Sequence, residues 1–140
     1  MQVLQSQSTS NPSSISQAAA VAALNHPATF FEGWLATLDK RRQRVLAMIA
    51  ATDGVSARTP EGAFYIFANC QALMGRVTPE GETLDSDKAL ANWLLAQTQV
   101  AVLHGSAFGT PGYLRIACAG EGGWLEAACE RMEKACGLLS

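Results

Sequence analysis

Apolar and polar positions alternate most regularly near the C-terminal end of the chain, in segment 113–118. The alternation places Leu114, Ile116 and Cys118 on one face of an extended segment. The other face then carries Arg115, with one residue of the same face on either side. The pattern predicts a strand that buries one face and holds a single arginine on the opposite face.

Helical spacing of apolar residues predicts four helices. The longest has about 21 residues, roughly 30 Å, and ends at Asp53-Gly54. Its expected start is a capping box, in which Thr29 caps the helix and Glu32 reaches back to Thr29. Its predicted apolar line is Phe31, Leu35, Leu38, Val45 and Ile49. The other helices are expected from Ile15 to Leu24, from Asp85 or Ser86 through Gln97, and from Gly122 to Leu138.

Three more segments are predicted to be strands. Val55 to Ala57 and Ala63 to Phe67 flank the turn-forming residues 59–62, and a strand at Val100 precedes the arginine strand. The order is helix, helix, two strands, helix, two strands, helix. We therefore predict an α+β fold, with a small, largely antiparallel sheet covered by helices and a long N-terminal helix that connects it to something larger.

Length and charge limit the kinds of partner. The 140 residues suit one domain, and the net charge of −2 gives no basic field for nucleic acid. Residues 40–44 include four basic side chains, which we expect on a solvated helix face. No apolar run approaches the ~20 residues that cross a bilayer, and the N-terminus lacks a signal-peptide pattern. These features predict a cytoplasmic protein with neither nucleic acid nor membrane as partner.

The four cysteines do not follow the spacing of a metal site or a redox pair. No Cys-x-x-Cys occurs among Cys70, Cys118, Cys129 and Cys136, and neither histidine lies at ligand spacing from them. We expect no metal. The cysteines are predicted to be free, mostly buried thiols, with Cys129 and Cys136 on one face of the last helix.

The candidate chemistry centres on Arg115. An arginine in such a strand snorkels to solvent, meets a structural carboxylate or binds an anionic ligand. The loop 104–109 is bounded by glycines and returned toward this strand by Pro111-Gly112, and the guanidinium fork suits a carboxylate. Ser106 beside His104 could suggest a nucleophile and its base. However, residues 105–109 are not a Gly-x-Ser-x-Gly elbow, and no third group is evident.

Four motifs together resemble one enzyme family. They are the segment Gln5 to Pro12, the run Gly-Ala-Phe-Tyr-Ile-Phe at 62–67, the loop 104–109 and the arginine strand. In this order, from Gln5 to Leu138, the chain resembles the fold-type I, class I/II pyridoxal phosphate aminotransferases, and among them the bacterial aspartate aminotransferase group. The resemblance implies that residues 28–140 are the C-terminal small domain. Residues 1–27 would then be the end of the large domain and would contact the partner subunit of a homodimer.

The resemblance also assigns roles to individual residues. Arg115 matches the arginine that binds the substrate α-carboxylate, and Phe64 matches an aromatic residue that lines the substrate pocket, although a core aromatic of the strand is the other interpretation. Ser10 and Asn11 match positions near the active site of the partner subunit, or are simply turn formers. Relatives that bind a dicarboxylate side chain with a second arginine would carry it near Ser6, where this chain has none.

The family's catalytic lysine is not found in this sequence. It would form a Schiff base with the cofactor from a Ser-x-x-Lys stretch upstream of Met1, whereas Lys40, Lys88 and Lys134 lack those flanks. The resemblance thus implies a C-terminal fragment of an enzyme that exchanges amino groups between an amino acid, aspartate-like, and a 2-oxo acid. Pyridoxal phosphate would bind to the parent enzyme, and the fragment alone would be inactive. The alternative is a free-standing, non-catalytic α+β binding or assembly module with an anion site at Arg115.

Overall fold

The computed structural model describes residues 2–140 and divides the chain into two compact units, one extending to Leu35 and the other from Ala36 to Ser140. The first unit contains α1 (Gln2–Ser8), α2 (Ser14–Leu24), the 3-10 turn η1 (Ala28–Phe31) and the first turn of α3 (Glu32–Ala51). None of the side chains of residues 2–35 is buried. The polar residues at the start of the chain thus form short helices whose side chains are all exposed.

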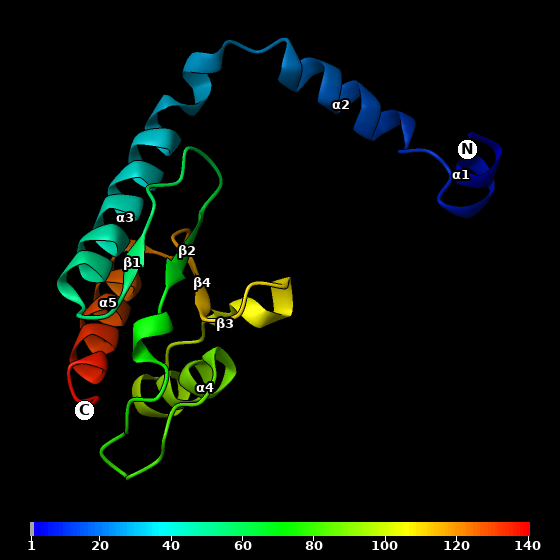
Figure 1. Ribbon diagram of the computed structural model, residues 1–140. Helices are drawn as coiled ribbons and strands as arrows, with labels where there is room; N and C mark the ends of the chain where they lie inside the picture. The colour runs from blue at the N-terminus through cyan, green and yellow to red at the C-terminus, as the bar shows by residue number, and fades with distance from the viewer. Residues whose placement is uncertain (1) are drawn as a thin grey trace. The chain divides into compact units, whose positions relative to one another are not determined.

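The second unit is built on a four-stranded sheet with the order β1-β2-β4-β3. Its strands are β1 (Ser56–Ala57), β2 (Tyr65–Asn69), β3 (Leu103–His104) and β4 (Tyr113–Ala117), and every neighbouring pair is antiparallel (Figure 1). The predicted α+β class and the small antiparallel sheet are confirmed. The arginine strand β4 lies in the interior of the sheet, between β2 and β3.

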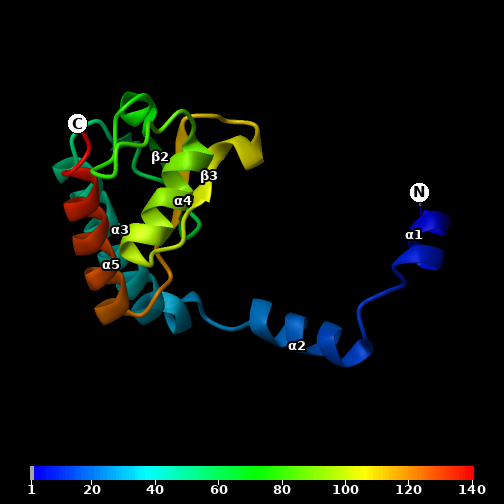
Figure 2. The same ribbon diagram turned by 90° about the horizontal axis from the view of Figure 1, so that it is seen from below.

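Helices cover one face of this sheet. In both views α3 lies beside α5 (Gly122–Cys136), on the same side of the strands (Figures 1 and 2). Arg44 of α3 pairs with Glu126 of α5 at 2.5 Å, which links the two helices. The helix α4 (Asp87–Thr98) packs against α5 and the edge strand β3, and a short 3-10 turn, η2 (Gln71–Leu73), follows β2.

The core lies between the sheet and these helices. Burying apolar side chains there supplies the main stabilisation of the unit, about 1.5–3 kcal/mol for each large side chain that is fully removed from water. The most deeply buried large side chains come from both layers: Ile66 of β2, Leu73 of η2, Leu90 and Leu94 of α4, and Val45 of α3.

Local signals explain where α4 begins and ends. The Ser86 hydroxyl accepts a hydrogen bond from the Ala89 amide at 3.2 Å, which satisfies one of the free amides of the first turn. Of the two capping candidates, Asp85 and Ser86, it is Ser86 that caps the helix. Gln99 ends the helix in the left-handed conformation, with φ of 57°, and its amide donates to the Leu95 carbonyl.

The start of α3 differs from the prediction. The expected capping box of Thr29 and Glu32 does not form, because Thr29 lies inside the turn η1, which directly precedes the helix, and so is not in a capping position. Phe31 and Leu35 are 47% and 62% exposed, whereas the buried residues of α3 are Val45, Met48 and Ile49. Periodicity identified the helix, but it could not show that only its C-terminal half reaches the sheet.

The basic residues of α3 do not form a merely solvated face. The Arg41 guanidinium donates to the Ala119 carbonyl at 3.0 Å, and that of Arg42 donates to the Pro60 carbonyl at 2.8 Å. These two bonds tie α3 to the loops that flank β2 and β4, while the Arg44–Glu126 pair ties it to α5. The prediction of a solvated face was wrong for these arginines, because their length lets them reach the ends of the sheet.

All four cysteines are free and buried, as predicted. Burial raises the pKa of the Cys70 thiol to about 12 and that of the Cys136 thiol to about 11. The thiols are therefore neutral at physiological pH and fill the core as small apolar groups. In residues 2–140 no cluster of three His, Cys, Asp or Glu side chains could hold a metal ion, and no helix is long and apolar enough to cross a membrane.

Candidate functional site

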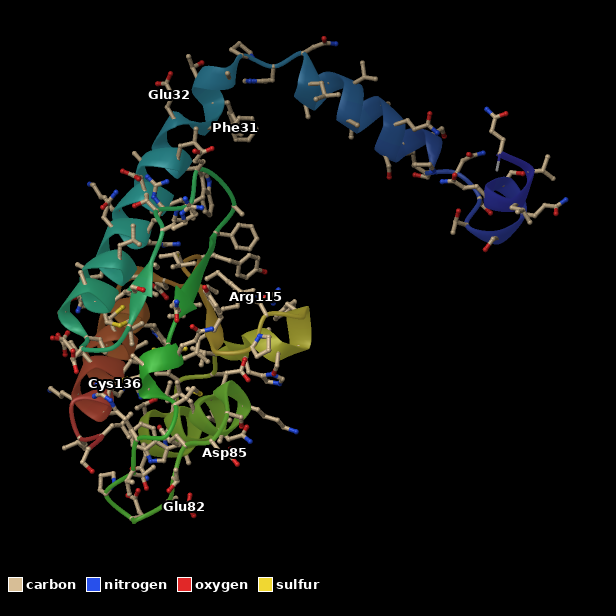
Figure 3. All side chains as sticks on the ribbon, viewed as in Figure 1. Phe31, Glu32, Glu82, Asp85, Arg115 and Cys136 are labelled. Atoms are coloured by element: carbon tan, nitrogen blue, oxygen red, sulfur yellow. The ribbon has the colours of Figure 1, made fainter. Side chains whose placement is uncertain are left out.

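The strand β4 separates the core from the candidate site. Leu114 and Ile116 are 4% and 7% exposed on the core side, and Cys118 just beyond the strand is also buried. Arg115 points to the opposite face and is half-buried. The alternation read from the sequence is thus confirmed. Figure 3 shows Arg115 on the side of the sheet away from α3 and α5, next to the 3-10 turn η3 (Gly105–Phe108).

Aromatic rings surround the guanidinium of Arg115. Its central carbon Cζ lies 4.5 Å from the centre of the Tyr65 ring and 4.2 Å from the centre of the Phe108 ring. Tyr65 comes from β2 and Phe108 from η3, so two separate elements bring the rings to the same cation. Contacts of this kind contribute roughly 0.5–2 kcal/mol each, depending on desolvation.

Because of the sheet register, further aromatic side chains pack beside this contact. Phe67 and Leu103 are the cross-strand neighbours of Arg115 on either side. The Phe67 ring stacks on the Tyr113 ring with centres 5.3 Å apart and lies edge-on to the Phe108 ring at 6.4 Å. We call Tyr65, Phe67, Phe108, Tyr113 and Arg115 the arginine cluster.

The electrostatics of the cluster leave the cation without a counter-ion. Within residues 2–140 the guanidinium of Arg115 makes no ion pair and no hydrogen bond. The interactions that it does make are those with the two aromatic rings. The rings cover the guanidinium through their faces, while recognition of a carboxylate uses the N–H groups in its plane. Such a half-buried, unpaired fork can bind the carboxylate of a ligand in bidentate fashion.

The loop beside the cluster is held by a buried carboxylate. The Asp87 side chain, 3% exposed, accepts hydrogen bonds from the Ser106 amide at 2.7 Å and from the Gly112 amide at 3.2 Å. Burial disfavours the charged form, but the hydrogen bonds outweigh it and hold the pKa of the Asp87 carboxyl below its usual value. This carboxylate is therefore ionised and fixes the η3 turn.

The same geometry excludes Ser106 as an activated nucleophile. His104 Nδ1 lies 2.7 Å from the Ser106 hydroxyl, as a base would. The third group, Asp87, binds Ser106 itself instead of orienting the histidine. Because a catalytic triad requires the acid on the far side of the histidine, the arrangement is that of a structural turn.

The other predicted site residues are placed as follows. Phe64 is 46% exposed, so it is not a core aromatic, and its ring packs on the Tyr65 ring with centres 4.7 Å apart. This contact places Phe64 at the border of the arginine cluster. Ser10 and Asn11 are exposed and belong to the other compact unit. Their contact with a partner subunit stays a prediction.

Comparison with known proteins identifies the family. The sequence model for the family Aminotransferase class I and II matches residues 1–132, nearly the whole chain. The chain belongs to the class I and II aminotransferases. Among its curated relatives, the aspartate aminotransferase of Rhizobium meliloti (strain 1021) is 46% identical over 140 residues, and a probable aspartate/prephenate aminotransferase of Rickettsia felis is 41% identical over 140 residues.

Solved aminotransferase structures share the fold. The crystal structure of the aspartate aminotransferase from Rhizobium meliloti superimposes with a TM-score of 0.92 at 45% identity, over 99% of this chain. The alanine aminotransferase from Pyrococcus furiosus gives 0.77 at 29% identity, over 90% of this chain. This chain covers 34% and 30% of those two proteins, and 34% of each of the two curated relatives. The chain thus spans about a third of the length of the aminotransferases that it matches.

The aminotransferase family implies pyridoxal phosphate in the complete enzyme, but the residues of this chain do not fit that cofactor on their own. A lysine must reach the cofactor beside the substrate. Lys40, Lys88 and Lys134 are exposed on α3, α4 and α5, and none belongs to an element that carries the arginine cluster. Residues 2–140 thus contain the candidate carboxylate site without the reactive group.

Three residues of this candidate site were not identified from the sequence. Tyr65 and Phe108 pack on Arg115, and Asp87 holds η3. Alternation in β2 could have placed Tyr65 opposite the buried Ile66, on a face able to meet Arg115. Nothing local indicated the partners of Asp87 or Phe108, because both depend on how the loop 99–112 closes over the sheet.

Proposed function

We propose that this chain is the C-terminal part of a pyridoxal phosphate-dependent aminotransferase. In this proposal residues 28–140 form the small domain, and residues 1–27 end the large domain and contact the partner subunit of a homodimer. The chain covers about a third of each relative, which supports its being one part of a longer enzyme. So does the high exposure of Ile15 and Leu24 in α2, 82% and 85%, which a larger assembly would cover.

The observation that carries the proposal is the unpaired cation of the arginine cluster. Arg115 is half-buried, touches two aromatic rings and has no anionic partner in residues 2–140. A ligand carboxylate would complete its coordination. Arg115 would bind the α-carboxylate of the substrate and so orient the amino group for reaction, which is a positioning role without proton transfer. Phe64, at the border of the cluster, would line the substrate pocket.

The substrates follow from the relatives and from the chemistry of the site. The relatives are named as aspartate or aspartate/prephenate aminotransferases. We propose an amino acid, aspartate-like, and a 2-oxo acid as the substrates, since both present a carboxylate to Arg115. Ser10 and Asn11 would approach the active site of the partner subunit. The 140-residue chain alone would be inactive, because its three lysines are exposed and belong to none of the elements that carry the arginine cluster.

The first experiment is to read the source gene upstream of Met1. A frame that continues through a Ser-x-x-Lys stretch and a cofactor-binding domain supports the proposal. A stop codon directly upstream of Met1 would favour the alternative, a free-standing module with an anion site at Arg115.

The second experiment substitutes Arg115→Lys in the longer enzyme. Lysine keeps the charge but loses the planar fork, so we expect a loss of about 2 kcal/mol or more, roughly 30-fold in kcat/KM for the amino-acid half-reaction. Stopped-flow absorbance of the cofactor with aspartate measures this rate. The matched control is Arg58→Lys, because Arg58 is an exposed arginine of the β1–β2 loop. An unchanged half-reaction in Arg115→Lys would show that the carboxylate site is elsewhere.

A further inference from the structure

The carboxylate of Asp87 connects two segments that are distant from it in the sequence. Asp87 is the first residue of α4, and its Oδ2 accepts from the amides of both Ser106 and Gly112. Hydrogen bonds to a charged acceptor are stronger than those between neutral groups, so this carboxylate fixes two backbone positions relative to one helix end.

One of these positions determines where the Phe108 ring lies. Ser106 and Phe108 belong to the same 3-10 turn, which is closed by the Thr110 amide donating to the Gly105 carbonyl at 3.0 Å. The turn has no room to adjust at its start, because a Cβ on Gly105 would lie 2.3 Å from the Thr110 carbonyl oxygen. A restraint on Ser106 is therefore passed to Phe108 through a rigid turn.

The other position determines where the arginine strand begins. Gly112 immediately precedes β4, and its carbonyl also accepts from the Cys70 amide at 2.9 Å. Arg115 lies three residues further along the same strand. Asp87 thus holds the backbone that carries Phe108 and the backbone that carries Arg115, the two partners of the 4.2 Å contact.

From this arrangement we propose that Asp87 is a positioning residue of the carboxylate site. By binding the amides of Ser106 and Gly112, it keeps the Phe108 ring against Arg115 and so holds the guanidinium fork in one orientation. The positioning rests on the geometry of this chain alone. Its consequence for substrate binding rests on the function proposed above.

The positioning is tested on the 140-residue chain by NMR. Nuclei over the face of an aromatic ring resonate upfield, so the side-chain resonances of Arg115 report whether the Phe108 ring covers it. Asp87→Ala should move these resonances toward the positions seen in Phe108→Leu. The double variant should resemble Phe108→Leu alone, since the two changes act through one contact.

The controls separate positioning from stability. Asp85→Ala removes an exposed carboxylate just before α4, one that contacts the Ser86 hydroxyl, and should leave the Arg115 resonances in place. Should Asp87→Ala not fold, Asp87→Asn, which keeps an oxygen acceptor at the same site, is measured in its place and should give a smaller shift in the same direction. Unchanged Arg115 resonances in either folded Asp87 variant would refute the proposal.

The consequence for binding is tested in the longer enzyme with maleate as a dicarboxylate probe. Isothermal titration should show affinity reduced about tenfold to a hundredfold in Asp87→Ala, as expected when a binding group is displaced. A loss in Arg115→Lys without a loss in Asp87→Ala would refute this inference and leave the proposed function intact. No loss in Arg115→Lys would refute the proposed function, while the NMR result would still decide the role of Asp87.

Discussion

At the scale of single residues, Arg115 differs from the other arginines that reach across the fold. Arg41 and Arg42 donate to the carbonyls of Ala119 and Pro60, so their charges serve to fix loops. Arg115 instead meets aromatic faces, which attract a cation but leave its N–H donors available. A structural arginine therefore differs from a ligand-binding one in whether its in-plane N–H groups already donate to protein acceptors.

The residue whose space is most restricted near the site is Gly105. We expect Gly105→Ala to lower the free energy of unfolding by about 1–3 kcal/mol, because the new Cβ would lie 2.3 Å from the Thr110 carbonyl oxygen and 2.7 Å from the Tyr113 Cβ. Urea unfolding followed by tryptophan fluorescence measures the change. Gly62→Ala is the control, because a Cβ at that position would have no atom within 4 Å, and its stability should be unchanged or slightly higher. Equal stability of the two variants would contradict the tight packing of η3.

At the scale of elements, the site depends on how α4 is joined to η3. The helix contributes no side chain to the arginine cluster, yet its first residue binds the loop that completes the cluster. The strand β4, which carries Arg115, and the turn η3, which carries Phe108, are thus both held by the start of α4. A helix end can do this because a carboxylate in its first turn is favoured both by the helix dipole and by nearby amides.

This junction should be sensitive to acid. The folded pKa of Asp87 lies below its unfolded value, so its contribution to stability is present above the unfolded pKa and is lost as pH falls through the folded pKa. We expect Asp87→Asn to be less stable than the parent chain at pH 7, with the difference shrinking below about pH 4. Urea midpoints from pH 7 to pH 3 measure it, with Asp85→Asn as the control. A difference independent of pH would show that the charge of Asp87 does not hold η3.

At the scale of the whole molecule, the two compact units differ in how they are stabilised. The second unit holds the buried apolar residues, beginning with Val45 along the chain, whereas every side chain from 2 to 35 is exposed. The first unit thus has helices without a core of its own. The two units divide between Leu35 and Ala36, whereas the boundary proposed from the family resemblance, between residues 27 and 28, lies eight residues earlier and stays a prediction.

A shortened chain tests that contrast. We expect residues 28–140 to unfold with a free energy within about 0.5 kcal/mol of the full chain, because no buried side chain is removed. Urea unfolding of both chains gives the comparison. A chain that starts at residue 50 is the control and should not fold, because it lacks Val45, Met48 and Ile49. A clear loss of stability in the 28–140 chain would place the domain boundary earlier.

The sequence by itself determined the features that depend on near neighbours. Alternation gave the two faces of β4, and the start of α4 was expected at Asp85 or Ser86, beside the observed cap. The resemblance of four motifs pointed to the family that the comparison established. These inferences held because periodicity and capping are set by a few consecutive residues.

Only the tertiary structure decided which distant residues meet. The rings over Arg115, the amides bound by Asp87 and the exposure of Phe31 and Leu35 could not be read from local patterns. The physical reason is that each depends on sheet register, loop closure or the extent of helix packing, which are fixed by the burial of the whole core. The sequence alone therefore predicts which face of β4 carries Arg115, whereas only the tertiary structure shows that Arg115 has no anionic partner among residues 2–140.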